Sequence, residues 1–278
     1  MGERVTWANV ISAQSVSMGR DKRLKILTPI EVHEGIYVKR EDRFEVAGIR
    51  GGKVRACWAL SNGAKGLVTA GSRQSPQCNI VAQIAKFKGI PCHIHTAKGE
   101  LGDELKLAVK AGAKIHQWDM GYSNVLACRA KAQARELGFK EIPFGMECWE
   151  SVSQTRRQVR NFPEGVKRVV VVVGSGMSLS GVLWGLKDQV VTIPVLGVRV
   201  GGGVDRTKFS PVLARRLDKY APPDWKKTEF VHAGIPYDKF APVQNLGKLQ
   251  LDPIYEAKCI PFLKKGDLFW DVGIRQAV

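Results

Sequence analysis

The feature that most constrains the fold of this chain is an apolar run that ends in a glycine-rich turn, VVVVVGSGMSLSGVLWGL, from Val169 to Leu186. Its five consecutive valines do not alternate with polar residues, which is typical of a strand buried on both faces of a parallel sheet. A Gly-Ser-Gly turn and a helix-like stretch follow at once. This order predicts a strand–turn–helix unit in the core of an α/β fold.

Strand-like and helix-like stretches alternate along the chain from Val54 onward. The pattern therefore predicts an α/β protein with mostly parallel, twisted sheets. Strands are predicted at 66–71, 91–97, 114–119, 140–145, 167–174, 192–200, 228–234 and 267–273. Helices are predicted at 53–63, 77–89, 103–113, 123–138 and 150–162, with further helices between the later strands.

The glycine-rich turn is a candidate phosphate site. Backbone N–H groups converge at such a turn, and the start of the following helix adds partial positive charge. Ser175 and Ser178 can add hydroxyl donors, although a tight turn without a ligand is the alternative. Leu179 stands where a dinucleotide motif needs its third glycine, and the chain has no G-x-x-x-x-G-K-[ST] motif. A smaller phosphorylated cofactor fits the turn better.

A second candidate is Lys53, which follows Gly51 and Gly52 directly at the start of a helix-like run. The two glycines either form a solvated turn or clear space around a reactive amine. The residues around the lysine leave both readings open.

Charge and composition limit the partners and the location. Lys and Arg number 43 against 26 Asp and Glu, a net charge of +17, which indicates either solvated helix faces or a polyanionic partner.

No apolar run is long enough to span a membrane, and no secretory signal precedes the first strands. The scattered cysteines and histidines predict reduced thiols and no metal site, although His93 and His95 share one strand face. We therefore expect a cytoplasmic protein, in a phage-infected host or otherwise.

Five stretches resemble, in the expected order, the fold-type-II pyridoxal-phosphate (PLP) enzymes of the tryptophan synthase β superfamily. Within that superfamily, the resemblance is to the aminocyclopropane-carboxylate deaminase and D-cysteine desulfhydrase group. The stretches are TPIEVHEGIYVKRED (28–42), GGKVRACWAL (51–60), GSRQSPQCNIVAQIAKFKG (71–89), GSGMSLSG (174–181) and LDPIYEAK (251–258). The resemblance covers most of the chain.

The resemblance implies a role for each matched position. Lys53 is the Schiff-base lysine and then the base that moves a proton at the substrate carbon. Glu256 faces the pyridine nitrogen, although an acid at the start of a helix can also simply favour the helix dipole. Tyr255 is a catalytic acid/base or a stacking residue. The phosphate is held by Gly174, Ser175, Gly176, Met177 and Ser178, the substrate carboxylate by Ser75 and Gln77, and the cofactor also by Asn79.

The chain departs from the pattern of this group in three ways, so the substrates of the group cannot be assigned to it directly. The group usually has asparagine before the lysine, where this chain has Gly52. It also has Ser-Asn-Gln in the substrate loop, where Pro76 replaces the asparagine and offers neither a side-chain donor nor an N–H. The chain is also shorter than expected of the group.

These inferences combine into one expected enzyme. Residues 1–52 and 161–278 form a large PLP-binding domain, 53–160 form a smaller inserted domain, and two copies form a homodimer. The reaction is lyase- or deaminase-like, or a β-replacement or decarboxylation, on a free amino-acid-like amine. In the alternative, the amine is an amino acid attached to a nucleic-acid base, as in phage-type DNA hypermodification. A third reading is an inactive PLP-fold binding protein.

If the substrate amine is attached to a nucleic acid, seven basic residues are candidates for binding its phosphates. They are Arg156, Arg157, Arg160, Arg206, Lys208, Arg215 and Arg216. Their side chains would meet phosphates around the cleft.

Overall fold

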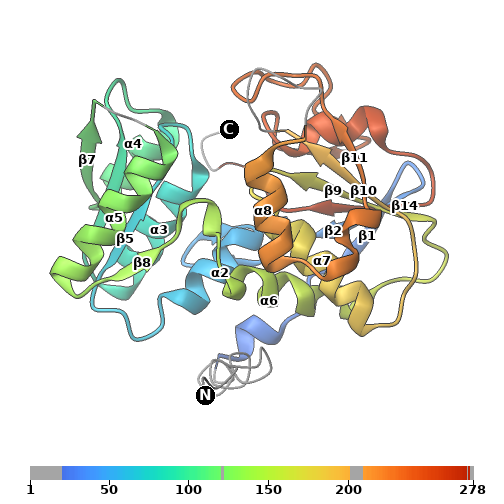
Figure 1. Cartoon of the computed structure of the whole chain (residues 1–278), viewed down its shortest axis with the longest axis horizontal. Helices are drawn as coiled ribbons and strands as arrows, with labels where there is room; N and C mark the ends of the chain where they lie inside the picture. Colours follow the sequence, from blue (N-terminus) through green and yellow to red (C-terminus); the bar gives the residue numbers. More distant parts are fainter. Residues whose placement is uncertain (1–20, 120–121, 201–208, 274, 276–278) are drawn as a thin grey trace, which may run out of the picture.

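The computed structural model describes residues 21–119, 122–200, 209–273 and 275. These residues form an α/β protein with two separate, mostly parallel sheets, one in each of two lobes (Figure 1). The predicted fold class is therefore confirmed. In this part of the chain, no helix is both long enough and apolar enough to cross a membrane.

The smaller lobe is built on a four-stranded sheet of order β7-β6-β5-β8, in which every pairing is parallel. Helix α5 covers one face of this sheet, and α3 and α4 cover the other. Because helices cover both faces, the strands bury apolar side chains on both. The elements are β5 (Leu67–Ala70), β6 (Cys92–Ala97), β7 (Lys114–Trp118), β8 (Lys140–Ile142), α3 (Pro76–Lys88), α4 (Asp103–Lys110) and α5 (Ser123–Leu137).

The larger lobe is built on a six-stranded sheet of order β1-β2-β14-β9-β10-β11. Only the edge pair β1–β2 is antiparallel. The valines of β9 alternate between two hydrophobic clusters on opposite faces, so the strand is buried on both faces as predicted. The elements are β1 (Ile30–His33), β2 (Ile36–Arg40), β9 (Arg168–Val173), β10 (Val195–Arg199), β11 (Glu229–His232), β14 (Asp267–Asp271), α7 (Met177–Asp188) and α8 (Pro211–Tyr220).

Short elements complete the described chain. Two small antiparallel hairpins are β3 (Glu45–Val46) with β4 (Ile49–Arg50), and β12 (Asn245–Leu246) with β13 (Leu249–Gln250). The 3-10 helices are η1 (Lys22–Lys25), η2 (Glu41–Arg43), η3 (Phe144–Met146), η4 (Val159–Asn161), η5 (Pro223–Lys227) and η6 (Glu256–Phe262).

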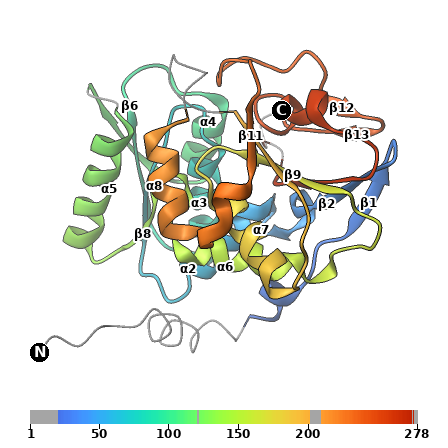
Figure 2. The same cartoon turned by 45° about the vertical axis from the view of Figure 1, so that its right-hand side comes forward.

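Helices α2 (Gly52–Leu60) and α6 (Trp149–Gln158) lie between the two lobes (Figures 1 and 2). Helix α6 packs closely against α7 because Gly181 and Gly185 leave room for it. An added Cβ at Gly181 would lie 2.8 Å from the carbonyl oxygen of Val152, and one at Gly185 would lie 2.8 Å from that of Arg156. The domain boundary after residue 160 stays a prediction, and α6 packs on the larger lobe.

Three histidines form a polar cluster on the face of the smaller sheet that α5 covers. His93 and His95 share one face of β6, as their alternation predicts, and His116 of β7 stacks beside both. Trp118 donates to Nδ1 of His95 at 3.0 Å, and Nε2 of His95 lies 2.9 Å from Oε1 of Gln133. A ring nitrogen that accepts a hydrogen bond cannot carry a proton, so the contact with Trp118 requires a neutral His95, whose Nε2–H then donates to Gln133.

The histidine cluster predicts that the free energy of unfolding decreases as the pH is lowered below about 6.5. Burial lowers the pKa of His95, and burial together with the neighbouring imidazoles lowers that of His116 to about 4. The unfolded chain therefore takes up protons below about pH 6.5 that the folded chain resists, so the free energy of unfolding should fall from pH 6.5 toward pH 4. Urea unfolding measured across this pH range should show a shallower decline in the free energy of unfolding for His116→Gln than for wild type. An unchanged slope in His116→Gln would contradict this reading.

Candidate active site

Gly51, Gly52 and Lys53 form a bend, called the lysine elbow below, where α2 begins beside the end of β14. Gly51 has a φ of +123°, a conformation that L side chains rarely adopt. An added Cβ there would lie 3.2 Å from the carbonyl oxygen of Val272, to which the N–H of Gly52 donates at 2.7 Å. The glycines thus hold the backbone against the strand end, and Lys53 in the first turn of α2 lines a cavity beside it.

The glycine-rich turn lines the same cavity. All five residues from Gly174 to Ser178 contribute to its wall. Gly176 has a φ of +88°, and α7 begins at the next residue, so the unpaired N–H groups of the first helical turn lie at this end of the cavity. Lys53 and Gly174, 121 positions apart in the sequence, are brought together here. The turn has the backbone geometry of an anion-binding cradle.

Tyr255 lines the same cavity as Lys53 and the glycine-rich turn. It precedes η6, lines the cavity, and its hydroxyl oxygen would lie 2.5 Å from a Cβ added at Gly174. Burial raises the pKa of the hydroxyl well above its ordinary value. The phenol therefore stays protonated at neutral pH and can donate a hydrogen bond.

Glu256 is buried next to this tyrosine, and its Oε2 atom has no hydrogen-bond partner among the described residues. Burial raises the pKa of its carboxyl well above the usual range, and the neighbouring Asp252 and Asp271 raise it further. It is close enough to Lys53 to raise the pKa of that amine in turn. A cationic N–H placed against Oε2 would satisfy the oxygen and favour the ionised form.

Burial lowers the pKa of the Lys53 amine, and the positive charge of Arg275 adds to that effect. An amine with a lowered pKa is more often unprotonated near neutral pH, and only the unprotonated amine is a nucleophile or a base. The cavity therefore holds a lysine suited to covalent chemistry.

The predicted substrate loop at the start of α3 lies near Lys53 but does not line the cavity with it. Cys78 lies near both Lys53 and the substrate loop. Burial raises the pKa of its thiol to about 12, while the Lys53 charge and a hydrogen bond with Ser75 act in the opposite direction. Gln77 uses both amide hydrogens on the protein, donating to Oγ1 of Thr69 at 3.0 Å and to the carbonyl oxygen of Pro143 at 2.7 Å.

Asn79 is also engaged within the protein. Its amide donates to Glu104 at 2.9 Å, and its oxygen accepts from Gln83 at 3.1 Å. The roles predicted for Ser75, Gln77 and Asn79 stay predictions.

Several residues at the site escaped the sequence reasoning. Glu41, Ser151, Thr155 and Trp270 line the cavity. Two others, Tyr237 and Arg275, lie beside Glu256. The charge of Arg275 lowers the pKa of both Tyr237 and Glu256, and the charge of Glu256 raises that of Tyr237. The available signal was topological: in open α/β sheets the ligand crevice lies outside the carboxyl ends of the strands, and Arg275 follows a predicted strand end.

The family is shown by comparison with known proteins. Residues 23–248 match the family model described as "Pyridoxal-phosphate dependent enzyme". The chain belongs to this family, and it is a PLP-dependent enzyme of fold type II.

Named relatives are similar over most of their length. A putative 1-aminocyclopropane-1-carboxylate deaminase of Thermotoga maritima is 26% identical over 264 residues, covering 80% of this chain and 81% of the relative. A D-cysteine desulfhydrase of Salmonella paratyphi A is 28% identical over 270 residues, covering 83% of this chain and 80% of the relative. Lyase- and deaminase-like chemistry fits these relatives, and nothing in them favours a nucleic-acid-bound amine or an inactive protein.

Solved structures agree on the fold. The crystal structure of an ACC deaminase homologue superimposes with a TM-score of 0.76 at 23% identity, covering 95% of this chain and 94% of the other. A threonine deaminase isoform from Solanum lycopersicum gives a TM-score of 0.66 at 16% identity, covering 96% and 90%.

The residues present fit the PLP cofactor of the family. One cavity is lined by the Lys53 amine, which can hold an aldehyde carbon, and by the glycine turn at the start of α7, whose N–H groups can bind a phosphate. The unpartnered Oε2 of Glu256 is suited to a pyridinium N–H. Both ends of the cofactor therefore have a matching group in this chain.

The basic residues proposed for nucleic-acid binding are spread over several elements. Arg156 pairs with Asp188, and Arg216 pairs with Glu147 at 2.6 Å. Arg160 and Arg215 are exposed, whereas Arg206 and Lys208 lie outside the described residues. The two ion pairs reduce the positive charge that this set offers to phosphates.

Proposed function

We propose that this enzyme uses PLP to remove a group from a small free amino acid by elimination or deamination. Decarboxylation and β-replacement are the other reactions open to the same residues. The observation that carries the proposal is that Lys53 and the turn from Gly174 to Ser178 line one cavity. The relatives named as a deaminase and a desulfhydrase support an amino-acid substrate.

Lys53 has two roles in this proposal. Its amine would hold the cofactor covalently, and once a substrate amine had taken its place, Lys53 would be free to move a proton at the substrate carbon. Both steps need the unprotonated amine, which the lowered pKa of Lys53 favours. When bound, PLP supplies an electron sink for the substrate carbon from which a proton or leaving group departs.

The other residues position the cofactor and control protons. The N–H groups from Gly174 to Ser178 bind the phosphate at the start of α7. Glu256, whose buried Oε2 has no partner among the described residues, would accept a hydrogen bond from a protonated ring nitrogen and stabilise its charge. Tyr255, kept protonated by its raised pKa, donates a proton or hydrogen bond to the departing group. Ser75 and the start of α3 receive the substrate carboxylate.

Chemical trapping tests the proposal. Protein purified with PLP should be yellow, and borohydride reduction followed by peptide mass spectrometry should find the pyridoxyl group on Lys53. The reason is that reduction makes the lysine–cofactor bond permanent. A label on another lysine, or no label after PLP is supplied, would show that the cofactor site is wrongly assigned.

Two finer statements about assembly and location belong to the same proposal. We infer a homodimer, as the resemblance implies, and light scattering of the purified protein checks it. The cytoplasmic location stays a prediction.

A further inference from the structure

Arg275 is a buried cation with unused hydrogen-bonding capacity. The residue is 8% exposed, and its Nε and Nη1 atoms have no hydrogen-bond partner among the described residues. The nearest acid, Asp252, lies 3.4 Å from Nε and also accepts the backbone N–H of Arg275 at 3.1 Å. Leaving charged donors unpaired in a buried site is costly, so this arrangement points to a missing anion.

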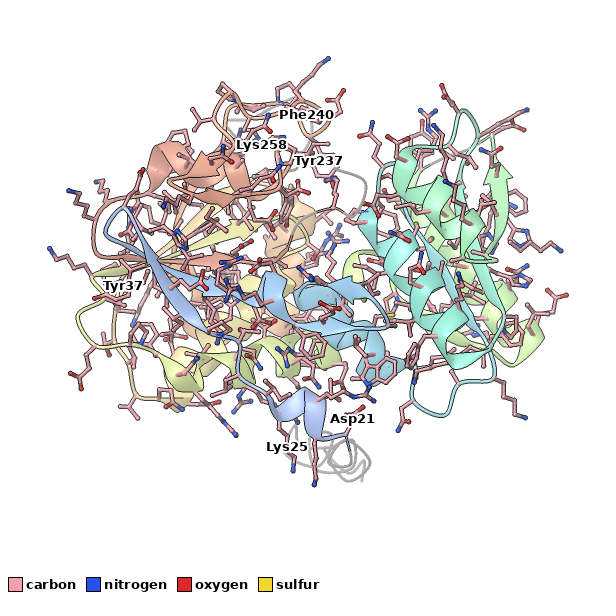
Figure 3. The ribbon with its side chains drawn as sticks, turned by 180° about the vertical axis from the view of Figure 1, so that it is seen from behind. Asp21, Lys25, Tyr37, Tyr237, Phe240 and Lys258 are labelled. Carbon is pink, nitrogen blue, oxygen red and sulfur yellow. The ribbon has the colours of Figure 1, made fainter. Side chains whose placement is uncertain are left out.

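The guanidinium lies at the active site. It is close enough to Lys53 to lower the pKa of the amine, and it also acts on Glu256 and on the hydroxyl of Tyr237. Tyr237 belongs to a loop that Lys258 holds by donating to the carbonyl oxygens of Pro236 at 2.7 Å and Tyr237 at 3.1 Å. Figure 3 shows Tyr237 and Lys258 together on the part of the larger lobe that faces the smaller lobe.

The residues on the other side of Lys53 offer no such cation. The start of α3 presents Ser75, while Pro76 has no N–H and both amide hydrogens of Gln77 are engaged within the protein. Helix N–H groups and a hydroxyl suit the carboxylate that every amino acid carries. The unpartnered Nη1 of Arg275 can donate a charge-assisted hydrogen bond to a second carboxylate.

We propose that Arg275 binds a side-chain carboxylate, and that the substrate is therefore a small acidic amino acid. This inference rests on the proposed function, because it assumes an amino acid joined to the cofactor at Lys53. Its chemistry is recognition only: Nη1 of Arg275 donates a hydrogen bond to the carboxylate, while Asp252 keeps its contact with Nε.

The test compares matched acidic and neutral amino acids. Wild-type enzyme should prefer aspartate to asparagine, or glutamate to glutamine, in one stereochemical series by at least about tenfold in kcat/KM, since a charge-assisted bond is lost with the amide. Arg275→Gln should remove most of this preference, measured as the ratio of kcat/KM for the acidic amino acid to that for the neutral one, because any effect on the Lys53 amine changes both values alike. Arg275→Lys should restore part of it, and the exposed control Arg160→Gln should change neither.

A second readout does not depend on turnover. Succinate should raise the melting temperature of cofactor-free wild-type protein more than butyrate does, and Arg275→Gln and Arg275→Lys should lose all or part of that difference. This measurement also shows whether either variant fails to fold.

Three results would overturn the inference. They are a wild-type enzyme without acidic preference, an equal loss of acidic and neutral substrates in Arg275→Gln, and a changed cofactor spectrum with selectivity retained. The second result would assign Arg275 to the common carboxylate, and the third to balancing the charge of Glu256. Failure of the borohydride label on Lys53 would instead refute the proposed function, so the two failures are distinguishable.

Discussion

Replacing Lys53 with alanine should lower turnover by at least about a thousandfold, which corresponds to about 4 kcal/mol of activation free energy. The substitution removes both the covalent attachment of the cofactor and the base that moves the substrate proton, and no neighbouring group can supply both functions. Steady-state kinetics with saturating PLP, together with the absorbance of the bound cofactor, measure the effect.

The matched control is Lys65→Ala, at an exposed position that follows the same helix and does not line the cavity. It should keep wild-type turnover and the wild-type cofactor spectrum. Lys53→Arg adds a second comparison, because it retains the positive charge but not an amine that can attach the cofactor. Near-normal turnover in Lys53→Ala would assign the reactive amine to a different residue.

Glu256→Gln should retain PLP but lower turnover by at least about tenfold, or about 1.4 kcal/mol of barrier. Glutamine has nearly the same shape and can occupy the same buried position, but it carries no charge to hold the ring nitrogen protonated. A less positive ring stabilises negative charge on the substrate carbon less well. Single-turnover kinetics measure the effect on the chemical step directly.

The exposed substitution Glu45→Gln serves as the control for loss of an acid, and it should leave the chemical step unchanged. If Glu256→Gln had an unchanged chemical step, Glu256 would be only an acid at the start of η6. That outcome would leave its unpartnered oxygen unexplained, so the pH dependence of cofactor absorbance should be compared in the same two variants.

The local signals in the sequence were reliable where one element alone determines the structure. Five valines in succession predict a strand buried on both faces, and β9 has this burial because α7 and α8 cover one face and the η6 segment the other. The turn at Gly174–Gly176 and the elbow at Gly51 both use positive φ values that favour glycine. Backbone conformation is a local property, so local residues can predict it.

The candidate site was only partly predictable. Resemblance named Lys53, Tyr255 and the phosphate turn, which line one cavity, and Glu256, which is buried beside them. It also named Gln77 and Asn79, whose amides hydrogen-bond within the protein. A sequence motif gives the identity of a side chain, but the packing of neighbouring elements decides which groups it contacts.

The alternation of strands and helices and the two glycine turns could be predicted from the sequence, because each depends on residues adjacent along the chain, whereas the reactive role of Lys53 came from the resemblance. Tertiary packing was needed to show that the end of β14 lies against Gly51 and Gly52 and that a buried, partly unpaired Arg275 follows this strand. Residues from three distant segments, around 53, 256 and 275, act on one another there. Their interaction depends on distance in space and on exclusion of water, and neither quantity is encoded in the spacing of residues along the chain.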